Sequence, residues 1–536
     1  MKTDLETSTN QSFSWAGHAL VALALSVGWG IRGNFGHEYG AMIPGALSAI
    51  AVALASGRSD WLKRFAHFGF LGAVGWSFGG GISYMQVIAY THSGHSNSAL
   101  YGFACLTLIG FCWAALGGAF TAFPAFLDRS RLTALYVPAL IVFGAWIVQD
   151  FAVAAWHQPG GDSRHENPLY WFDTDWIGAS VALMAMAVYC GVRRWVDFGS
   201  SLVIHMAAGW WVGFAGLVLA LGFRMTPPRG DNWSGGVGLV LGLLVFLVRQ
   251  RLNGVLWVML VSGSLGGIAF ALATTLKLVA IKSGLQTNWH SLLEQTYGLL
   301  NGLAISLPMS WVCRRQPEVD DESTEEGSVR RRWTSAVAVT FVLGVVTYVN
   351  FTKNVAEWIK LGAVPPLLAG VPATYWYTGF YALLIATILG LTLRHLRRPL
   401  AIVPESAAGR AQLLFAILLW WVVVGNYERV LIAFKAVRLV TEGVIFVNAC
   451  LCTLLAFTLD RSRAAPAEAS RPRYGLFFLL GSFVVCAALV AGNIFGDWWV
   501  VRALHGDTFT GEASLHIRFG PNATVTPKPV KGAAHP

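Results

Sequence analysis

The chain has 536 residues, of which 55% are hydrophobic and only 12% are charged. A soluble domain is typically about 25% charged, so this chain has too little charge to cover a water-facing surface. The composition excludes a soluble enzyme, a disordered scaffold and a small disulfide-stabilised secreted domain. Apolar runs of about 20 residues recur from end to end, which predicts an all-α polytopic helical protein in a lipid bilayer.

The net charge and the cysteines both fit a membrane protein. The formal charge is +10, with 38 Lys and Arg against 28 Asp and Glu. The basic residues lie mainly in short loops between apolar runs, which indicates membrane orientation and no nucleic-acid partner. All seven cysteines fall inside apolar runs and read as small buried side chains, so we expect no disulfide, metal or cofactor. The first apolar run lacks a basic leader and a cleavage site, which predicts a retained span.

About fifteen spans follow from the length that a helix needs to cross the hydrocarbon core. In chain order, we expect them at residues 14–31, 39–56, 66–90, 99–126, 132–156, 176–192, 198–222, 235–250, 254–281, 291–313, 333–352, 374–393, 411–434, 440–459 and 474–497.

The distribution of basic residues predicts the orientation. With the N-terminus inside, 23 of the 38 Lys and Arg fall in cytoplasmic segments, and every cytoplasmic loop carries at least two. Positive charge concentrates on the cytoplasmic side of membrane proteins. We therefore expect a bacterial-type cytoplasmic (inner) membrane protein with a cytoplasmic N-terminus and an extracytoplasmic C-terminus.

The segment 314–332 is the one long charged cytoplasmic loop, and it predicts a solvated connector between two bundles. The expected organisation is an N-terminal bundle of spans one to ten over 1–313, the linker over 314–332, a C-terminal bundle of spans eleven to fifteen over 333–497, and an extracytoplasmic tail over 498–536.

Spans one to four resemble spans seven to ten, which suggests a parallel internal repeat. Gly30-Ile31-Arg32 and Gly222-Phe223-Arg224 end corresponding spans, and Gly-containing spans follow both. Paired spans interrupted by glycine point to a central binding site, with helix breaks expected at 79–81 and 266–267. The alternative is that these glycines only let helices approach closely.

Two places put carboxylates at or within the membrane. The segment 32–40 joins the first two spans in about nine residues, so His37 and Glu38 are expected at the membrane boundary. A carboxylate beside a histidine there suits proton coupling or general-base chemistry, and the alternative is a salt-bridged turn that fixes two helices. Glu442 falls within the fourteenth span, and Arg438, one turn earlier, is its expected partner.

The outer ends of the spans carry polar and aromatic residues that loop topology alone does not require. Cations among carboxylates suit an anionic or polyhydroxylated solute, since Arg binds carboxylate or phosphate with paired hydrogen bonds. His92 and His95 have the spacing of metal ligands, but no second ligand pair accompanies them and no metal is predicted. The expected substrate-binding residues are Arg32, Tyr84, Gln86, His92, His95, Arg224, Arg229, Asp231, Asn232, Trp233, Lys277, Trp289, Glu294, Glu428 and Arg429.

Two family patterns share single features with the chain. The loop 57–64 is similar to the cytoplasmic loop of major facilitator transporters in its Gly, Asp and basic residues, but it lacks the rest of that pattern. Membrane glycosyltransferases that use polyprenyl-phosphate sugars have an acidic residue in the first outer loop, where Glu38 stands here, but their loop is longer. Neither resemblance assigns the chain to a family.

The leading hypothesis is a secondary transporter of a polar anionic or sugar-like solute, coupled to protons or sodium through Glu38 and neighbouring carboxylates. Arg32, Arg224 and Arg229 would hold the solute near broken helices. The first alternative is a membrane transferase acting on a lipid-linked (polyprenyl-phosphate) sugar at the outer face, with Glu38 or His37 as the base. The second is a non-catalytic assembly subunit. Nucleotide-binding and zinc-protease motifs do not occur in the sequence.

Overall fold

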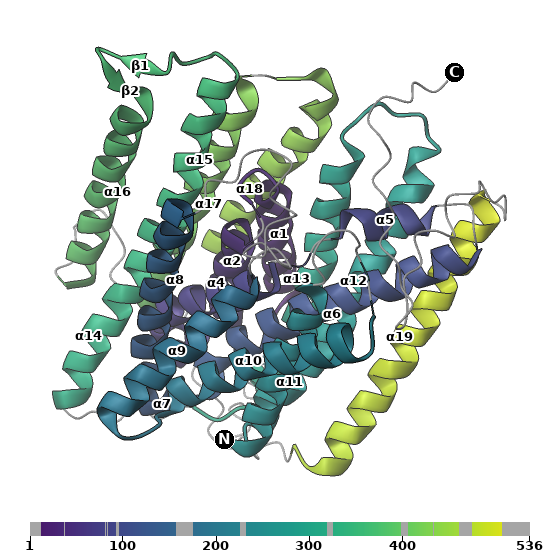
Figure 1. Ribbon diagram of the computed structural model, residues 1–536, viewed down its shortest axis with the longest axis horizontal. Helices are drawn as coiled ribbons and strands as arrows, with labels where there is room; N and C mark the ends of the chain where they lie inside the picture. The colour runs from purple at the N-terminus through teal and green to yellow at the C-terminus, as the bar shows by residue number, and fades with distance from the viewer. Residues whose placement is uncertain are drawn as a thin grey trace, which may run out of the picture. The chain divides into compact units, whose positions relative to one another are not determined.

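The structure is a computed structural model, and it describes residues 12–505 except 37, 81, 83, 93–95, 157–174, 224, 226–231, 319–324, 398–405, 433 and 460–473. Helices make up almost all of the described chain (Figure 1), which confirms the predicted all-α class. Large apolar side chains such as Phe477, Phe483 and Val484 on α19 (Leu476–His505) are exposed. Such a surface indicates a multi-pass protein in a lipid bilayer.

The chain forms two compact units that are interleaved in sequence. Unit 1 comprises residues 1–81, 110–133 and 250–493, and unit 2 comprises residues 82–109, 134–249 and 494–536. Segments from both sides of 314–332 belong to unit 1, and the predicted separation into two bundles at that linker stays a prediction.

Unit 1 contains most of the helices and the short hairpin. Its elements are α1 (Trp15–Arg32), α2 (Glu38–Ser56), α3 (Ser59–Lys63), α4 (Phe65–Gly80), α12 (Asn253–Ile281), α13 (Trp289–Arg315), α14 (Glu325–Thr340), the π-helix η4 (Phe341–Val345), α15 (Val346–Lys360), β1 (Leu367–Leu368), β2 (Val371–Pro372), α16 (Ala373–Arg397), α17 (Ala407–Leu431), the 3₁₀-helix η5 (Ala436–Arg438) and α18 (Leu439–Thr458). The two strands pair antiparallel, with Leu368 opposite Val371.

Unit 2 contains α5 (Met85–Thr91), α8 (Tyr136–Trp156), α9 (Asp175–Arg193), α10 (Phe198–Phe214), the π-helix η3 (Ala215–Ala220) and α11 (Asn232–Arg249). The helices α6 (Ser96–Phe126), α7 (Arg129–Ala134) and α19 contain residues of both units. A capping box begins α10, where the Asp197 side chain accepts from the Ser200 amide and Ser200 Oγ accepts from the Asp197 amide.

Twelve of the described helices are long and apolar enough to cross a membrane. They correspond to twelve of the predicted spans. The other three predicted spans, at 14–31, 66–90 and 291–313, are also helical but do not meet that criterion. α4 has only 16 residues, while α1 and α13 carry polar side chains such as Arg32 and Asn301, which lower their mean hydropathy. The count of about fifteen spans stays a prediction.

Close glycine crossings hold the centre of unit 1 together. α2 is almost wholly buried, and it crosses α4 where Gly45 and Gly72 face each other. A Cβ on Gly45 would lie 2.9 Å from the Gly72 carbonyl carbon and from Trp76 Cβ. Only glycine permits this backbone separation, so the two helices contact along their main chains.

The two predicted helix breaks have different outcomes. α4 ends at Gly80, as the glycines at 79–81 predict. The break predicted at 266–267 is wrong, because α12 runs without interruption from Asn253 to Ile281. Gly266 instead lets α12 approach α6, where its Cβ would meet Ala114 Cβ and the Gly110 carbonyl. Close packing explains this glycine pair, and the internal repeat stays a prediction.

Candidate functional site

The turn between α1 and α2 is tied to three other helices of unit 1. Asn34 donates from Nδ2 to Asn426 Oδ1 on α17 at 2.5 Å, and Asn426 donates from its own Nδ2 to Glu442 Oε2 on α18 at 2.7 Å. Lys353 on α15 donates to the Phe35 carbonyl. A two-amide chain therefore connects the first turn to a carboxylate within a membrane-spanning helix.

Glu442 is buried, with 6% of its surface exposed. Its hydrogen-bond partner is the neutral amide of Asn426, and the Tyr427 hydroxyl donates to its main-chain carbonyl at 2.6 Å. The predicted ion pair with Arg438 does not form within the part of the chain that the structure describes, although Arg438 still acts on the carboxylate through its charge. A carboxylate within a membrane-spanning helix costs free energy when no counter-ion is close. Such residues usually mark functional sites.

Glu38 begins α2, where its carboxylate faces the positive end of the helix dipole. The side chain is exposed, and its charge acts on Lys353. Its neighbour His37 lies outside the described residues. The turn between α1 and α2 therefore holds Glu38 where its charge acts on a lysine, and Glu38 is more exposed to solvent than Glu442.

Arg32, the last residue of α1, is brought next to Glu294 on α13. Arg32 is 2% exposed, its Nη1 lies 3.6 Å from Glu294 Oε1, and its Nη2 donates to the Gly80 carbonyl at 3.1 Å. His290, one turn before Glu294, places Nε2 3.8 Å from the same carboxylate oxygen. At 3.6 Å the Arg32–Glu294 pair is longer than a charge-assisted hydrogen bond.

Buried aromatic rings surround the Arg32 guanidinium. Its Cζ lies 4.4 Å from the Trp29 ring centroid and 5.2 Å from that of Trp113. Trp29 stacks on Trp113 at 4.9 Å and meets Tyr297 edge-on at 4.9 Å, while Trp113 packs against Phe270 at 5.2 Å. Cation–π attraction and the low dielectric strengthen any charge interaction made there.

A second polar group lies between α15, α16 and α17. Tyr381 donates to Glu428 Oε2 at 3.0 Å, and Trp358 donates to the Glu428 carbonyl at 3.0 Å. Arg429, the next residue, lies 3.6 Å from Glu357 and donates to the Lys353 carbonyl at 3.2 Å. Glu428 and Arg429 thus point to different partners.

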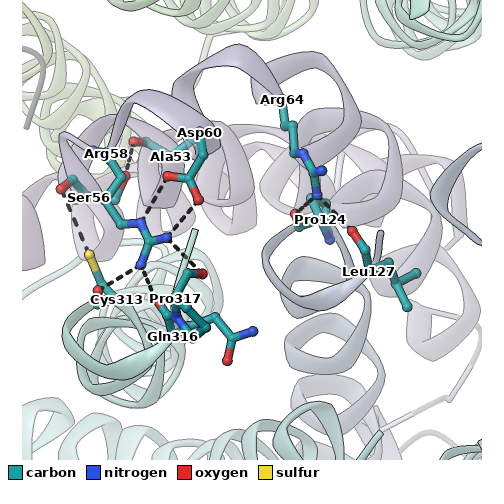
Figure 2. Close-up of polar contacts among 10 residues, drawn as sticks. All are labelled: Ala53, Ser56, Arg58, Asp60, Arg64, Pro124, Leu127, Cys313, Gln316 and Pro317. Carbon is teal, nitrogen blue, oxygen red and sulfur yellow. Dashed lines mark hydrogen bonds and ion pairs between the residues drawn. The ribbon is translucent and has the colours of Figure 1, made fainter. Parts of the chain in front are cut away.

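The short helix α3 and its flanks form a third polar group, at the opposite end of α2 from the first turn. Figure 2 shows the Arg58 guanidinium between Asp60 and the C-terminal end of α13. Arg58 donates to both Asp60 oxygens, at 2.9 and 2.6 Å, and to the carbonyls of Cys313, Gln316 and Pro317.

Arg64 makes the matching contact with α6 (Figure 2). It donates to the carbonyls of Pro124 at 2.9 Å and Leu127 at 2.8 Å, where α6 ends. Arg58 and Arg64 were counted among the loop residues that predict orientation, yet both are buried. They complete helix C-termini that would otherwise lack hydrogen-bond partners.

The remaining predicted site residues are placed elsewhere or lie outside the described residues. In unit 1, Lys277 is half-buried on α12, and Trp289 donates to the Leu285 carbonyl of its own turn. In unit 2, Tyr84, Asn232 and Trp233 are buried, Gln86 lies in α5, and the His92 ring places Nδ1 3.0 Å from the Ile88 carbonyl. The structure does not describe His95, Arg224, Arg229 or Asp231.

The aromatic rings around Arg32 were not predicted from the sequence. Tryptophan is typical of the membrane–water interface, yet Trp29, Trp76 and Trp113 are all buried. Trp29 precedes Arg32 by three residues, and that spacing places both on one helix face. Trp113 carries no such local signal, since only the packing of α6 against α1 brings it to Arg32.

Comparison with protein-family models, curated proteins and solved structures finds no match for this chain. Its function is therefore argued from the chemistry of the site.

Proposed function

We propose that the chain is an ion-coupled secondary transporter of a polar, anionic or sugar-like solute, with its site in unit 1 near the turn between α1 and α2. We further propose a bacterial-type cytoplasmic membrane, with the N-terminus inside and the C-terminus outside. Arg32 would bind the anionic group of the solute in place of Glu294, and the rings of Trp29 and Trp113 would offer flat apolar faces.

One observation carries this proposal: two buried carboxylates flank a hydrogen bond that joins α13 and α18. Gln295 Nε2 donates to the Thr441 carbonyl at 3.1 Å, and each of these residues directly adjoins a buried glutamate, Glu294 on α13 and Glu442 on α18. Glu294 pairs with Arg32, whereas Glu442 bonds to a neutral amide. A solute at Arg32 and an ion at Glu442 would therefore act on the same helix contact.

The coupling follows from the hydrogen bonds of Asn426. An ionised Glu442 accepts strongly from Asn426 Nδ2, and that amide in turn holds Asn34. Protonation or cation binding at Glu442 weakens this bond and loosens the turn that begins directly after Arg32. In this proposal the ion shifts the balance between two arrangements of the turn, and the solute binds one of them more tightly.

The first experiment reconstitutes the full chain in liposomes and records solute-driven currents on solid-supported membranes. The panel contains sugar acids, sugar phosphates and dicarboxylates, each tested with and without proton and sodium gradients. We expect a current with at least one class, lost in Arg32→Ala. Glu442→Gln should keep solute binding and lose the dependence on the ion gradient, because the amide mimics the neutral carboxyl group.

The controls distinguish the role of Glu442 from that of Glu38, and the transporter from the transferase. Arg131→Ala removes an exposed pair with Asp128 and should leave the currents unchanged. If Glu38→Gln leaves ion-dependent uptake intact, Glu38 has no role in coupling. Native mass spectrometry of the gently extracted protein identifies bound molecules. A stoichiometric polyprenyl-phosphate species, without current for any solute, would replace the transporter by the transferase.

A further inference from the structure

We propose that α15 and α17 bind a monovalent hard cation of the Na⁺ class through Asn350, Asn354 and Glu428. This site is distinct from Glu442, where the proposed function has the coupling ion act, and it does not rest on that proposal. The site itself is argued from side chains of unit 1 that lie apart from the Arg32–Glu294 pair.

Two buried amides lie on the face of α15 that packs against α17. Asn350, Asn354 and Trp358 are spaced by four residues and share one helix face. Asn354 donates from Nδ2 to the Gly425 carbonyl at 2.8 Å, and Trp358 donates to the Glu428 carbonyl, so this face lies against α17. Asn350 is 2% exposed and Asn354 is fully buried.

The oxygens of these two amides accept no hydrogen bond from the part of the chain that the structure describes. The Nδ2 atom of Asn350 also has no hydrogen-bond partner there. Because its Nδ2 is fixed by Gly425, Asn354 cannot turn to satisfy its oxygen elsewhere without losing that bond. Buried polar atoms of this kind need a partner, and an ion or an ordered water is the usual one.

Charge favours a cation as that partner. The two cations nearby each interact with another carboxylate: Arg429 contacts Glu357, and Lys353 interacts with Glu38. Glu428 interacts with Asn354 and accepts from the Tyr381 hydroxyl, but it forms no ion pair among the described residues. One negative charge therefore remains beside Asn354.

The donor set fits a monovalent hard cation. Amide and carboxylate oxygens suit alkali and alkaline-earth ions rather than thiophilic metals. A single carboxylate balances one positive charge, whereas Ca²⁺ sites draw on six to eight oxygens that usually include several carboxylates. The Tyr381 hydroxyl donates to one carboxylate oxygen of Glu428 and so orients the carboxylate beside Asn354.

The test measures binding of radiolabelled sodium to the purified full chain in detergent, in a background of N-methyl-D-glucamine. We expect saturable binding of about one ion per chain, displaced by Li⁺ more readily than by the larger K⁺. Glu428→Gln and Asn350→Ala should weaken it by at least about tenfold, since the first removes the negative charge and the second removes a ligand oxygen. Asn350→Asp, which keeps the oxygens and adds charge, should retain binding.

Gln412→Ala is the matched control, on the same helix as Glu428. Gln412 is also buried, donates its amide to the Ala456 carbonyl at 2.8 Å, and has an oxygen without a partner among the described residues. The Gln412→Ala variant should bind sodium like the unaltered protein.

No saturable sodium binding, or equal binding in all variants, would overturn the site. Sodium binding without any solute current would support the cation site and contradict the transporter proposal. A proton-driven solute current without sodium binding would support the transporter proposal and contradict the cation site.

Discussion

Three buried arginines of unit 1 each donate to the end of a helix. Arg32 donates to the last residue of α4, Arg58 to the end of α13, and Arg64 to the end of α6. The final carbonyls of a helix have no partners within the helix, and inside a membrane protein water does not supply them. A guanidinium supplies several donors in a fixed plane and also meets the negative end of the helix dipole.

Two of these arginines lie beside carboxylates, and the lengths of the two ion pairs differ. Asp60 holds Arg58 with two short bonds, whereas Glu294 meets Arg32 at 3.6 Å with no hydrogen bond between them. We therefore assign a structural role to Arg58 and keep the solute role for Arg32.

Arg58→Ala should destabilise the protein by about 3–5 kcal/mol, because it leaves a buried Asp60 and three carbonyls unpaired. Unfolding in mixed micelles, followed by tryptophan fluorescence, measures the loss. Arg131→Ala breaks an arginine–aspartate pair whose arginine side chain is 45% exposed, and it should cost less than about 1 kcal/mol. Equal midpoints for the two variants would contradict the structural role of Arg58.

At the scale of helices, glycine sets which pairs come into contact. α2 and α4 cross through Gly45 and Gly72, and α13 places Gly298 against the backbone of α1 near Leu25 and Ser26. Association of helices in lipid depends on such close packing, because lipid is as apolar as the side chains. The core of unit 1 is consequently specified by small residues as much as by large ones.

Gly72→Val should weaken the α2–α4 crossing by about 1–3 kcal/mol, since the added side chain overlaps the Gly45 carbonyl. Gly144→Ala on α8 is the matched control, because a Cβ there meets nothing within 4 Å. The control should be neutral or slightly stabilising, as alanine favours a helix over glycine. Thermal unfolding of both variants in the same detergent gives the comparison, and a stable Gly72→Val would remove this crossing from the core.

Local signals predicted some elements and missed others for a physical reason. The apolar runs predicted the all-α class, and the glycines at 79–81 predicted the end of α4. The glycines at 266–267 carry the same signal, yet their neighbours on α6 use them for packing. Arg32 and Glu294 were both expected at the site, but their pairing depends on how α1 packs against α13 and could not be read from spacing.

At the scale of the whole chain, the distribution of basic residues predicts one orientation. Buried Arg58 and Arg64 belong to that count and also make structural contacts, so part of the positive charge expected on the inner side serves the fold. The predicted orientation therefore rests mainly on the other loops expected in the cytoplasm, such as the charged segment 314–332.

Reporter fusions test this orientation on the full chain. Alkaline phosphatase joined after residue 536 should be active and green fluorescent protein at the same place should be dark, since the C-terminus is expected outside. Insertion of the same reporters within 319–324 should give the opposite result. A fluorescent C-terminal fusion would contradict the predicted orientation.

The contacts of Arg58 also constrain the order in which the protein can be made. Asp60 lies two residues away, but the carbonyls of Cys313 and Gln316 come 255 and 258 residues later. At about 5–20 residues per second, the ribosome completes α2 roughly 10–50 seconds before those carbonyls exist. During that interval Asp60 is the only one of these partners that Arg58 can bond. The hydrogen bonds that join the loop after α2 to α13 therefore form only once α13 has been made.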